Sequence, residues 1–364
     1  MEQVTIPRKP TRSSGYSLIV FFLILYVVGV MAATCWVFVL PAKFFYDGEY
    51  IRGLLESPQG LNFDPFVNTA RVFALLGYSA TTPREVVAVS VFTLSFLPAL
   101  IGFTLGLRNP SYTNLFLLAA WIGVSTIYLG QYSKELIALW FVFFALYWLG
   151  FKRPTAWMAI LIIAIYGIFF RSYWIIIAGF WMLLLWLSYR PWRFYLKMTF
   201  LLCVMALVSA AFYEVFGYHL TEVRDRVNEY RSDSPDAITM IRNYLPSETV
   251  LHDLLNWLIA WFFILIPLPV LRFFEAQYLV FFALMATTLY VTLRNRQGLV
   301  LQGMHLPPLV ERRIRGSITF MLAFTLVQGI FEPDYGSIVK HMTSLLPTLA
   351  YVLAFGQWNV RKVR

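Results

Sequence analysis

Apolar stretches alternate with short polar turns along almost the whole chain. Most of these stretches approach the roughly 20 residues that an α-helix needs to cross a bilayer. They predict an all-α, polytopic membrane helix bundle with about ten transmembrane helices. Three cover about residues 16–40, 86–107 and 113–130, a fourth ends at the basic turn 151–154, a hairpin of two reaches residue 189, and four more cover about 197–216, 277–293, 316–331 and 345–355.

One apolar run does not fit this alternation. Residues 254–271 are long enough to cross, but a crossing there would move the basic groups at 294–296 and 311–315 to the opposite side. Pro267 and Pro269 interrupt the helix, and broken backbone is tolerated in a membrane where protein buries it or where it lines a cavity. We therefore expect a re-entrant or interfacial element here.

The charged residues sort across the turns of this arrangement. One side receives 17 of the 29 basic residues but only Glu2 and Glu311 among the 19 acids. Because cytoplasmic turns are rich in Lys and Arg, this side and both termini are expected in the cytoplasm. The net charge of +10 is then a topology signal, and no nucleic-acid partner is expected. The basic residues on this side are Arg8, Lys9, Arg12, Arg108, Lys152, Arg153, Arg190, Arg193, Lys197, Arg294, Arg296, Arg312, Arg313, Arg315, Arg361, Lys362 and Arg364.

Composition excludes a soluble domain. Hydrophobic residues make up 59% of the chain and charged residues 13%. A soluble protein of this size needs more polar residues to cover its surface. We expect a single integral membrane domain over residues 1–364, with outer loops at about 41–85, 217–253 and 332–344. The chemistry is expected in these loops, on the face opposite the basic turns.

Arg171 is the most informative candidate on that face. It stands between two apolar segments with hardly any loop around it, so it lies close to hydrocarbon and needs an anionic partner. Glu135, Asp334 or a phosphate group would serve. A structural ion pair is the alternative to a role in binding substrate.

The outer segment 218–244 mixes arginines with acids at a spacing that suits a surface helix. A solvated, charge-laced helix is the usual explanation of such a pattern. The alternative is that inward-facing arginines hold a pyrophosphate, since a guanidinium offers paired donors to phosphate oxygens. The candidates for this clamp are Arg224, Arg231 and Arg242.

Acids and a histidine supply candidates for a base. Asp47 and Glu49 follow the first helix and are either interfacial acids or catalytic groups. Residues 332–341 hold Asp334, Lys340 and His341, and Pro333 and Gly336 predict a non-helical turn there. The chain has no metal-ligand spacing and no glycine-rich phosphate loop, so neither a metal nor a cofactor is expected.

Three short motifs resemble a known family. They are Asp334 to His341 followed by Pro347, Phe170 to Trp174, and Ser133 to Glu135 before an apolar stretch. Together with the layout of the helices they look like the Wzy and EpsG type of bacterial exopolysaccharide and O-antigen polymerases, which often carry a Gly-Thr/Ser-x-x-Arg/Lys-His element near the C-terminus. Lys340 stands where arginine is more usual in that element.

The resemblance implies a membrane-embedded glycosyltransferase of the C type in the bacterial cytoplasmic membrane. It would join undecaprenyl-pyrophosphate-linked oligosaccharide units at the outer face, in contact with membrane lipid, and it leaves room for a chain-length regulator or an export protein as a partner. Catalytic candidates are then Asp47, Glu49, Asp334 and His341, and substrate-binding candidates are Lys134, Glu135, Arg171, Tyr173, Arg224, Arg231, Arg242 and Lys340.

Two other classes of protein remain open at the level of sequence. A flippase or transporter of lipid-linked oligosaccharides would carry buried charges through the whole membrane depth and polar cavities on both sides. A membrane acyltransferase that modifies a polysaccharide would place a reactive histidine within or beside a span.

Overall fold

The protein is described from a computed structural model covering residues 13–57, 60, 62–104, 111–150, 156–231, 239–274, 276–301 and 308–355. The regular secondary structure of these residues is helical, and their one β contact is an isolated bridge between Met240 and Asp334. The elements are α1 (Ser13–Val39), η1 (Ala42–Phe45), α2 (Tyr46–Leu54), α3 (Pro65–Leu75), α4 (Arg84–Thr104), α5 (Tyr112–Tyr128), α6 (Lys134–Leu149), α7 (Ala156–Phe169), α8 (Tyr173–Tyr189), α9 (Phe194–Phe216), α10 (Glu222–Arg231), α11 (Val250–Leu265), η4 (Leu268–Phe273), α12 (Ala276–Leu301), α13 (Pro308–Phe331), α14 (Tyr335–Met342), η5 (Thr343–Leu345) and α15 (Leu346–Phe355).

Within the part of the chain that the structure describes, five helices are long and apolar enough to cross a membrane: α1, α4, α9, α12 and α13. Four shorter helices, α5, α7, α8 and α11, are also apolar. This content is compatible with a membrane protein and agrees with the all-helical prediction. The figure of about ten crossings stays a prediction.

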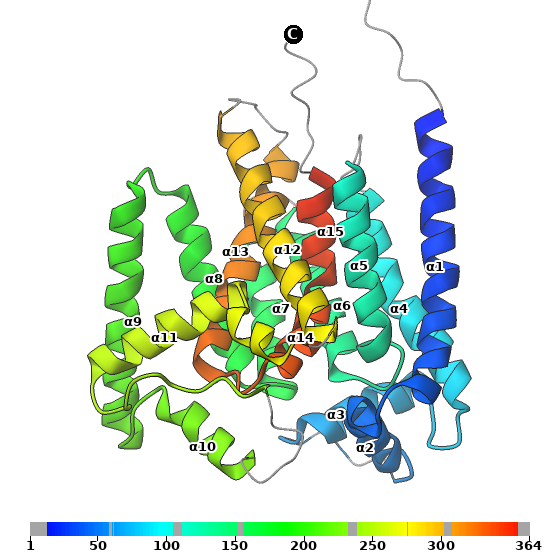
Figure 1. Cartoon of the computed structure of the whole chain (residues 1–364), viewed down its shortest axis with the longest axis horizontal. Coiled ribbons are helices and arrows are strands. Elements are labelled where there is room, and N and C mark those ends of the chain that lie inside the picture. Colours follow the sequence, from blue (N-terminus) through cyan, green and yellow to red (C-terminus); the bar gives the residue numbers. More distant parts are fainter. Residues whose placement is uncertain are drawn as a thin grey trace, which may run out of the picture.

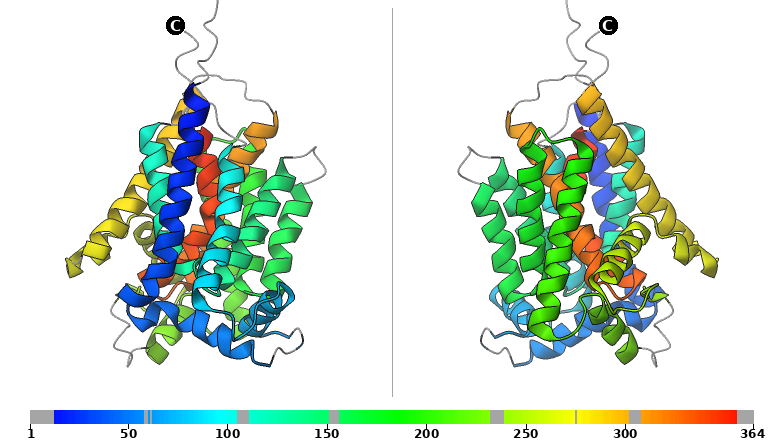
Figure 2. Two further views of the ribbon diagram at one scale, coloured as in Figure 1. Left: turned by 90° about the vertical axis from the view of Figure 1, so that its right-hand side faces the viewer. Right: turned by 90° about the vertical axis from the view of Figure 1, so that its left-hand side faces the viewer.

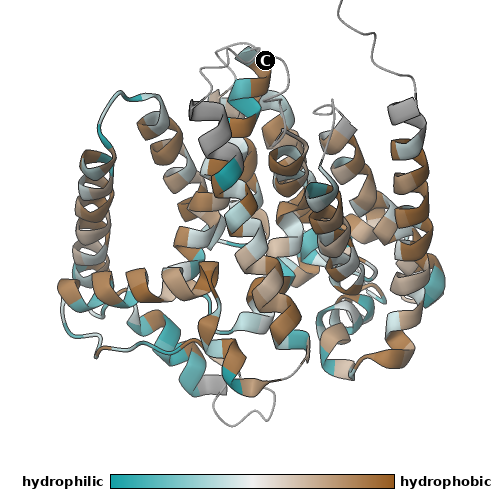
Figure 3. Ribbon diagram, turned by 45° about the horizontal axis from the view of Figure 1, so that its top comes forward, coloured by the Kyte–Doolittle hydropathy of each residue, from teal (hydrophilic) through white to brown (hydrophobic). Residues whose placement is uncertain are grey.

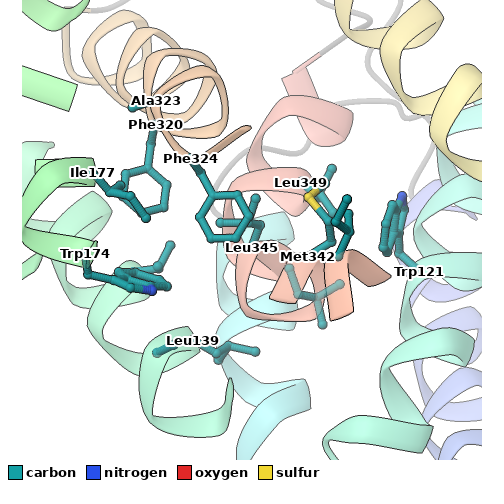
Figure 4. Packing of buried hydrophobic residues seen from close by; sticks show 14 of the residues in the cluster. Trp121, Leu139, Trp174, Ile177, Phe320, Ala323, Phe324, Met342, Leu345 and Leu349 are labelled. Carbon is teal, nitrogen blue, oxygen red and sulfur yellow. The ribbon is translucent and has the colours of Figure 1, made fainter. Parts of the chain in front are cut away.

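The helices form a bundle whose centre is α13 and α15 (Figure 1). Helix α13 packs against α6, α8, α11 and α15, and α15 packs against α4, α5 and α6. Aromatic and aliphatic side chains fill the space between them, with Trp174 of α8 against Phe324 of α13 and Leu345 beside it (Figure 4). Polar contacts add to this packing, since the indole of Trp257 donates to the carbonyl oxygen of Leu326 at 2.9 Å.

Helices α1 and α9 stand at the two flanks of the bundle (Figure 1). Both are apolar around most of their circumference, as the brown ribbons of Figure 3 show. Large side chains such as Phe38 and Leu207 are mostly exposed. A helix that is hydrophobic all round and still exposed is typical of a surface in contact with lipid. The flanks therefore match a bundle embedded in a bilayer.

Four short helices collect at one end of this bundle. Helix α1 begins and α15 ends at the upper end in Figure 1, whereas α2, α3, α10 and α14 lie at the lower end (Figures 1 and 2). The described parts of the three segments expected as outer loops therefore lie at this end, and their position outside the membrane stays a prediction. Residues 41–85 are more ordered than a loop, however, because they contain α2 and α3. Asp64 caps α3 by accepting from the backbone N–H of Phe66 at 2.7 Å, a local signal that hydropathy does not register.

Helix α11 covers most of the apolar run that does not fit the alternation. It lies obliquely across the lower half of the bundle, against α9 and α13, and α12 starts from the same end (Figure 1). Pro267 follows the end of the helix and the short η4 turn leads into α12. This segment does not run from one end of the bundle to the other, and its re-entrant or interfacial position stays a prediction.

Candidate functional site

Seven ionisable side chains from four parts of the chain meet at the lower end of the bundle. They form what we call the charged cluster: Asp47, Lys134, Glu135, Arg171, Glu332, Lys340 and His341. The cluster joins α2, the polar first turn of α6, the turn between α7 and α8, and the region of α14. The hairpin prediction is confirmed, because α7 and α8 are joined by a short turn that carries Arg171.

Glu135 is the centre of the cluster. Its side chain is fully buried, pairs with the guanidinium of Arg171, and accepts a hydrogen bond from the Ser133 hydroxyl at 2.6 Å. Burial raises the pKa of this carboxyl, but Arg171 and the other cations around it together hold the pKa well below its ordinary value. Glu135 therefore stays ionised, ahead of the apolar part of α6 that begins at Leu136.

Arg171 is held from two sides. It pairs with Glu135 and donates to the hydroxyl of Tyr173 at 3.1 Å. Burial opposes its charge, but the Glu135 carboxylate outweighs burial and keeps the pKa of Arg171 well above its ordinary value. The anionic partner expected for this arginine is thus Glu135, which leaves the role in binding substrate as a prediction.

His341 and Glu332 form a pair beside Glu135. The Nδ1 atom of His341 lies 2.9 Å from Oε2 of Glu332, whose side chain is almost fully buried. A carboxylate accepts, so Nδ1 carries the proton of this contact. In the neutral form of the ring, Nε2 is then the nitrogen with the lone pair. Nε2 faces Glu135 at 3.8 Å from Oε1. The arrangement is that of an imidazole held in one tautomer by a buried acid.

Two lysines meet at Asp47. The ammonium groups of Lys340 and Lys134 both contact Oδ2 of this residue, that of Lys134 at 3.7 Å. Lys134 also lies 3.3 Å from the centre of the Phe66 ring. Burial, reinforced by the nearby charge of Arg171, lowers the pKa of Lys134 to about 8. Asp47 is therefore the anion between two cations that belong to different elements.

Asp334 serves α14 directly. Its carboxylate accepts from the backbone N–H and from the hydroxyl of Ser337, each at 2.8 Å. The prediction of a non-helical turn here is wrong, because this cap starts a helix at Tyr335 that includes Gly336. A side chain at Gly336 would begin 3.1 Å from Oδ1 of Asp334, so the missing Cβ gives the capping carboxylate room.

Glu49 lies outside the charged cluster. It pairs with Arg84 of α4 at 2.9 Å, and both side chains are about half exposed. The two residues line a shallow pocket together with Arg52 and Gln131. An exposed pair of this kind adds little stability. The structure thus separates Glu49 from Asp47, although the two are neighbours on α2.

The three arginines expected to hold pyrophosphate differ in position. Arg224 is completely buried, and it donates to the carbonyl oxygens of Gly329 and Ile330 at the end of α13 and to Asn243 Oδ1 at 3.1 Å. Burial lowers the pKa of Arg224 to about 10. Arg242 is exposed in the segment before α11. Arg231 is the last residue of α10, and its side chain lies outside the described residues.

Sequence reasoning did not select Glu332 or Ser133 as site residues. Glu332 directly follows α13, so an acid at the end of a long apolar helix was the available signal. Its second oxygen, Oε1, is buried without a hydrogen-bond partner among the described residues. Within those residues no group of three His, Cys, Asp or Glu side chains is placed to hold a metal ion.

The charged cluster can therefore bind anions and accept a proton. Three cations line it, and a buried acid orients its one imidazole. Comparisons with protein-family models, with curated proteins and with solved structures find no match to this chain.

Proposed function

We propose that this chain is a polysaccharide polymerase of the bacterial cytoplasmic membrane. It joins oligosaccharide repeat units linked to undecaprenyl pyrophosphate at the outer face. The observation that carries the proposal is the Glu332–His341 pair beside Glu135 and Arg171, because it puts an oriented imidazole next to a set of cations. The resemblance of the motifs around Arg171 and His341 to polymerases of the Wzy and EpsG type supports the same reaction.

The cations serve the leaving group. A donor sugar linked through pyrophosphate leaves with several negative charges, so the site must supply positive charge where the bond breaks. Arg171, Lys134 and Lys340 fill this role. A guanidinium carries five N–H donors, so Arg171 can hold Glu135 and a phosphate oxygen at the same time. Tyr173 fixes the guanidinium from the other side.

The imidazole serves the acceptor. The hydroxyl of the acceptor sugar attacks C1 of the donor sugar and loses its proton to Nε2 of His341. The bond between C1 and the pyrophosphate oxygen breaks as the new glycosidic bond forms, and the lipid leaves as its pyrophosphate. Glu332 accepts from Nδ1 throughout, which stabilises the imidazolium and keeps the tautomer that can act as a base.

The proposal is tested by identifying the lipid-linked intermediate that accumulates in cells with an inactive variant of the protein. We expect cells with Arg171→Lys in place of the native protein to accumulate single lipid-linked repeat units at the outer face, since lysine keeps the charge but loses the planar fork. Immunoblotting controls for protein level in the membrane. Units retained at the inner face would indicate a transporter instead, and full-length polymer lacking a substituent would indicate an acyltransferase.

A further inference from the structure

We propose that Lys134 and Lys340 form a binding site for a phosphate or diphosphate group, and that the Asp47 carboxylate occupies this site in the empty protein. The inference rests on the proposed function for the identity of the natural ligand, the diphosphate of the lipid-linked donor. It assigns Asp47 a role different from that of a catalytic base. Asp47 is the group that the substrate displaces.

The geometry shows one anion shared by two cations. Both ammonium groups contact the same oxygen, Oδ2 of Asp47, and they come from α6 and α14, whereas Asp47 comes from α2. A single carboxylate carries less charge than the two ammonium groups that surround it. A diphosphate carries more charge and more acceptor oxygens, so it satisfies both lysines better than Asp47 does.

The exposed fractions of the three side chains support Asp47 as the partner that leaves. The side chain of Lys134 is 9% exposed and that of Lys340 22%, whereas that of Asp47 is 33% exposed. The cations thus belong to the body of the bundle and the anion to its edge. A part-exposed ion pair adds little stability, so a ligand with better charge complementarity replaces it readily.

Helix α2 can release its carboxylate without losing its packing. Gly48 and Ile51 are its buried residues, and neither carries a charge. Gly48 lies against the side chain of Gln131, which also donates to the carbonyl oxygen of Phe44 at 2.9 Å. These contacts hold α2 when the Asp47 side chain turns away.

The proposal is tested by binding of inorganic pyrophosphate to the purified full-length protein, measured by calorimetry in neutral detergent. Asp47→Asn removes the internal competitor, so the Kd for pyrophosphate should fall by about fivefold or more. Glu56→Gln is the matched control, because Glu56 is an exposed acid just after α2. Its Kd should stay within about twofold of that of the native protein.

The lysines provide the opposite change. Lys134→Met and Lys340→Met should each raise the Kd for pyrophosphate by about fivefold or more. If Asp47→Asn aggregates, Asp47→Ser makes the same measurement. A Kd that is unchanged or raised in the Asp47 variant would overturn the proposal, and so would an equal gain in Glu56→Gln, which would mean a general effect of net charge.

Two further measurements complete the test. One distinguishes a diphosphate donor from a phospholipid headgroup as the ligand, and the other tests the proposed function independently of the anion site. Repeating the titration in nanodiscs of phosphatidylglycerol should leave the gain of Asp47→Asn in place, whereas its loss would assign the lysines to phospholipid headgroups and overturn a donor site. Polymer formation is scored separately. If Asp47→Asn binds pyrophosphate more tightly but the native protein forms no polymer, the anion site is supported and the polymerase function is overturned. If the native protein forms polymer but Asp47→Asn does not bind pyrophosphate more tightly, only the anion site is overturned.

Discussion

At the scale of single residues, the arrangement around His341 depends on burial. An imidazole in water exchanges between two tautomers, but a buried carboxylate next to Nδ1 selects the one whose Nε2 accepts a proton. Glu332 meets this condition at 2.9 Å, and its nearly complete burial keeps water from competing. Asp334, only two residues further on, caps the N-terminus of α14. Residues close in sequence thus acquire different roles through their surroundings.

We expect His341→Ala to lower the rate of polymer formation by about 100- to 10,000-fold, the range for loss of a general base. Glu332→Gln should cause a loss of at least about 100-fold, because a glutamine amide can donate to Nδ1 and so favours the wrong tautomer. The measurement is single-turnover polymerisation in proteoliposomes. The double variant should be no slower than His341→Ala, since the two residues act as a unit. Losses that multiply in the double variant would contradict this coupling.

At the scale of elements, the site depends on how α13 ends. The guanidinium of Arg224 from α10 satisfies the carbonyl oxygens of Gly329 and Ile330, which lie just before Glu332. The C-terminal carbonyls of a helix lack partners within it, and a cation there also complements the helix dipole. Arg224 thus holds the end of α13, and with it the acid that orients His341.

Removing this cap should destabilise the protein. Arg224→Met leaves the carbonyl oxygens and Asn243 without their charged donor, and we expect a loss of about 2–4 kcal/mol in the free energy of unfolding. Thermal unfolding in detergent measures the shift in Tm. The control is Arg226→Met on the same helix, whose side chain is 57% exposed and pairs with Glu222. That change should cost less than about 1 kcal/mol, and equal losses would argue against the capping role of Arg224.

At the scale of the whole molecule, the bundle separates two kinds of surface. The short helices α2, α3, α10 and α14 lie at one end, and the basic turn at residues 190–193 lies at the other (Figure 1). The flanking helices expose apolar surface between these ends. A bilayer around that apolar zone would leave the charged cluster close to one of its two faces.

The orientation in the membrane can be tested by labelling introduced cysteines. Phe63→Cys and Glu248→Cys, both at exposed positions of the lower end, should react with a membrane-impermeant maleimide in intact cells. Arg193→Cys should react only after permeabilisation. Cys35 and Cys203 are exposed and must first be replaced by alanine. Labelling of Arg193→Cys in intact cells would show that the orientation is the reverse of the expected one.

The helical class, the alternation of helices and the position of Arg171 at the tip of a hairpin follow from the amino-acid sequence. These properties depend on local hydropathy and on the cost of placing charge in hydrocarbon, so each can be read within a short window of residues. Glu135 is one of three anionic partners that the sequence predicts for Arg171, and the other two are Asp334 and a phosphate group. Local signals could not choose among them.

Which charges meet depends on the packing of elements that are distant in the sequence. Lys340 and Asp47 are 293 positions apart, and their contact depends on α2 folding back over α6 and α14. The buried state of Glu332 and the use of Arg224 at the end of α13 depend on packing between elements in the same way. A side chain's charge, partner and burial are set by packing between elements, and no property of its neighbours in sequence encodes them.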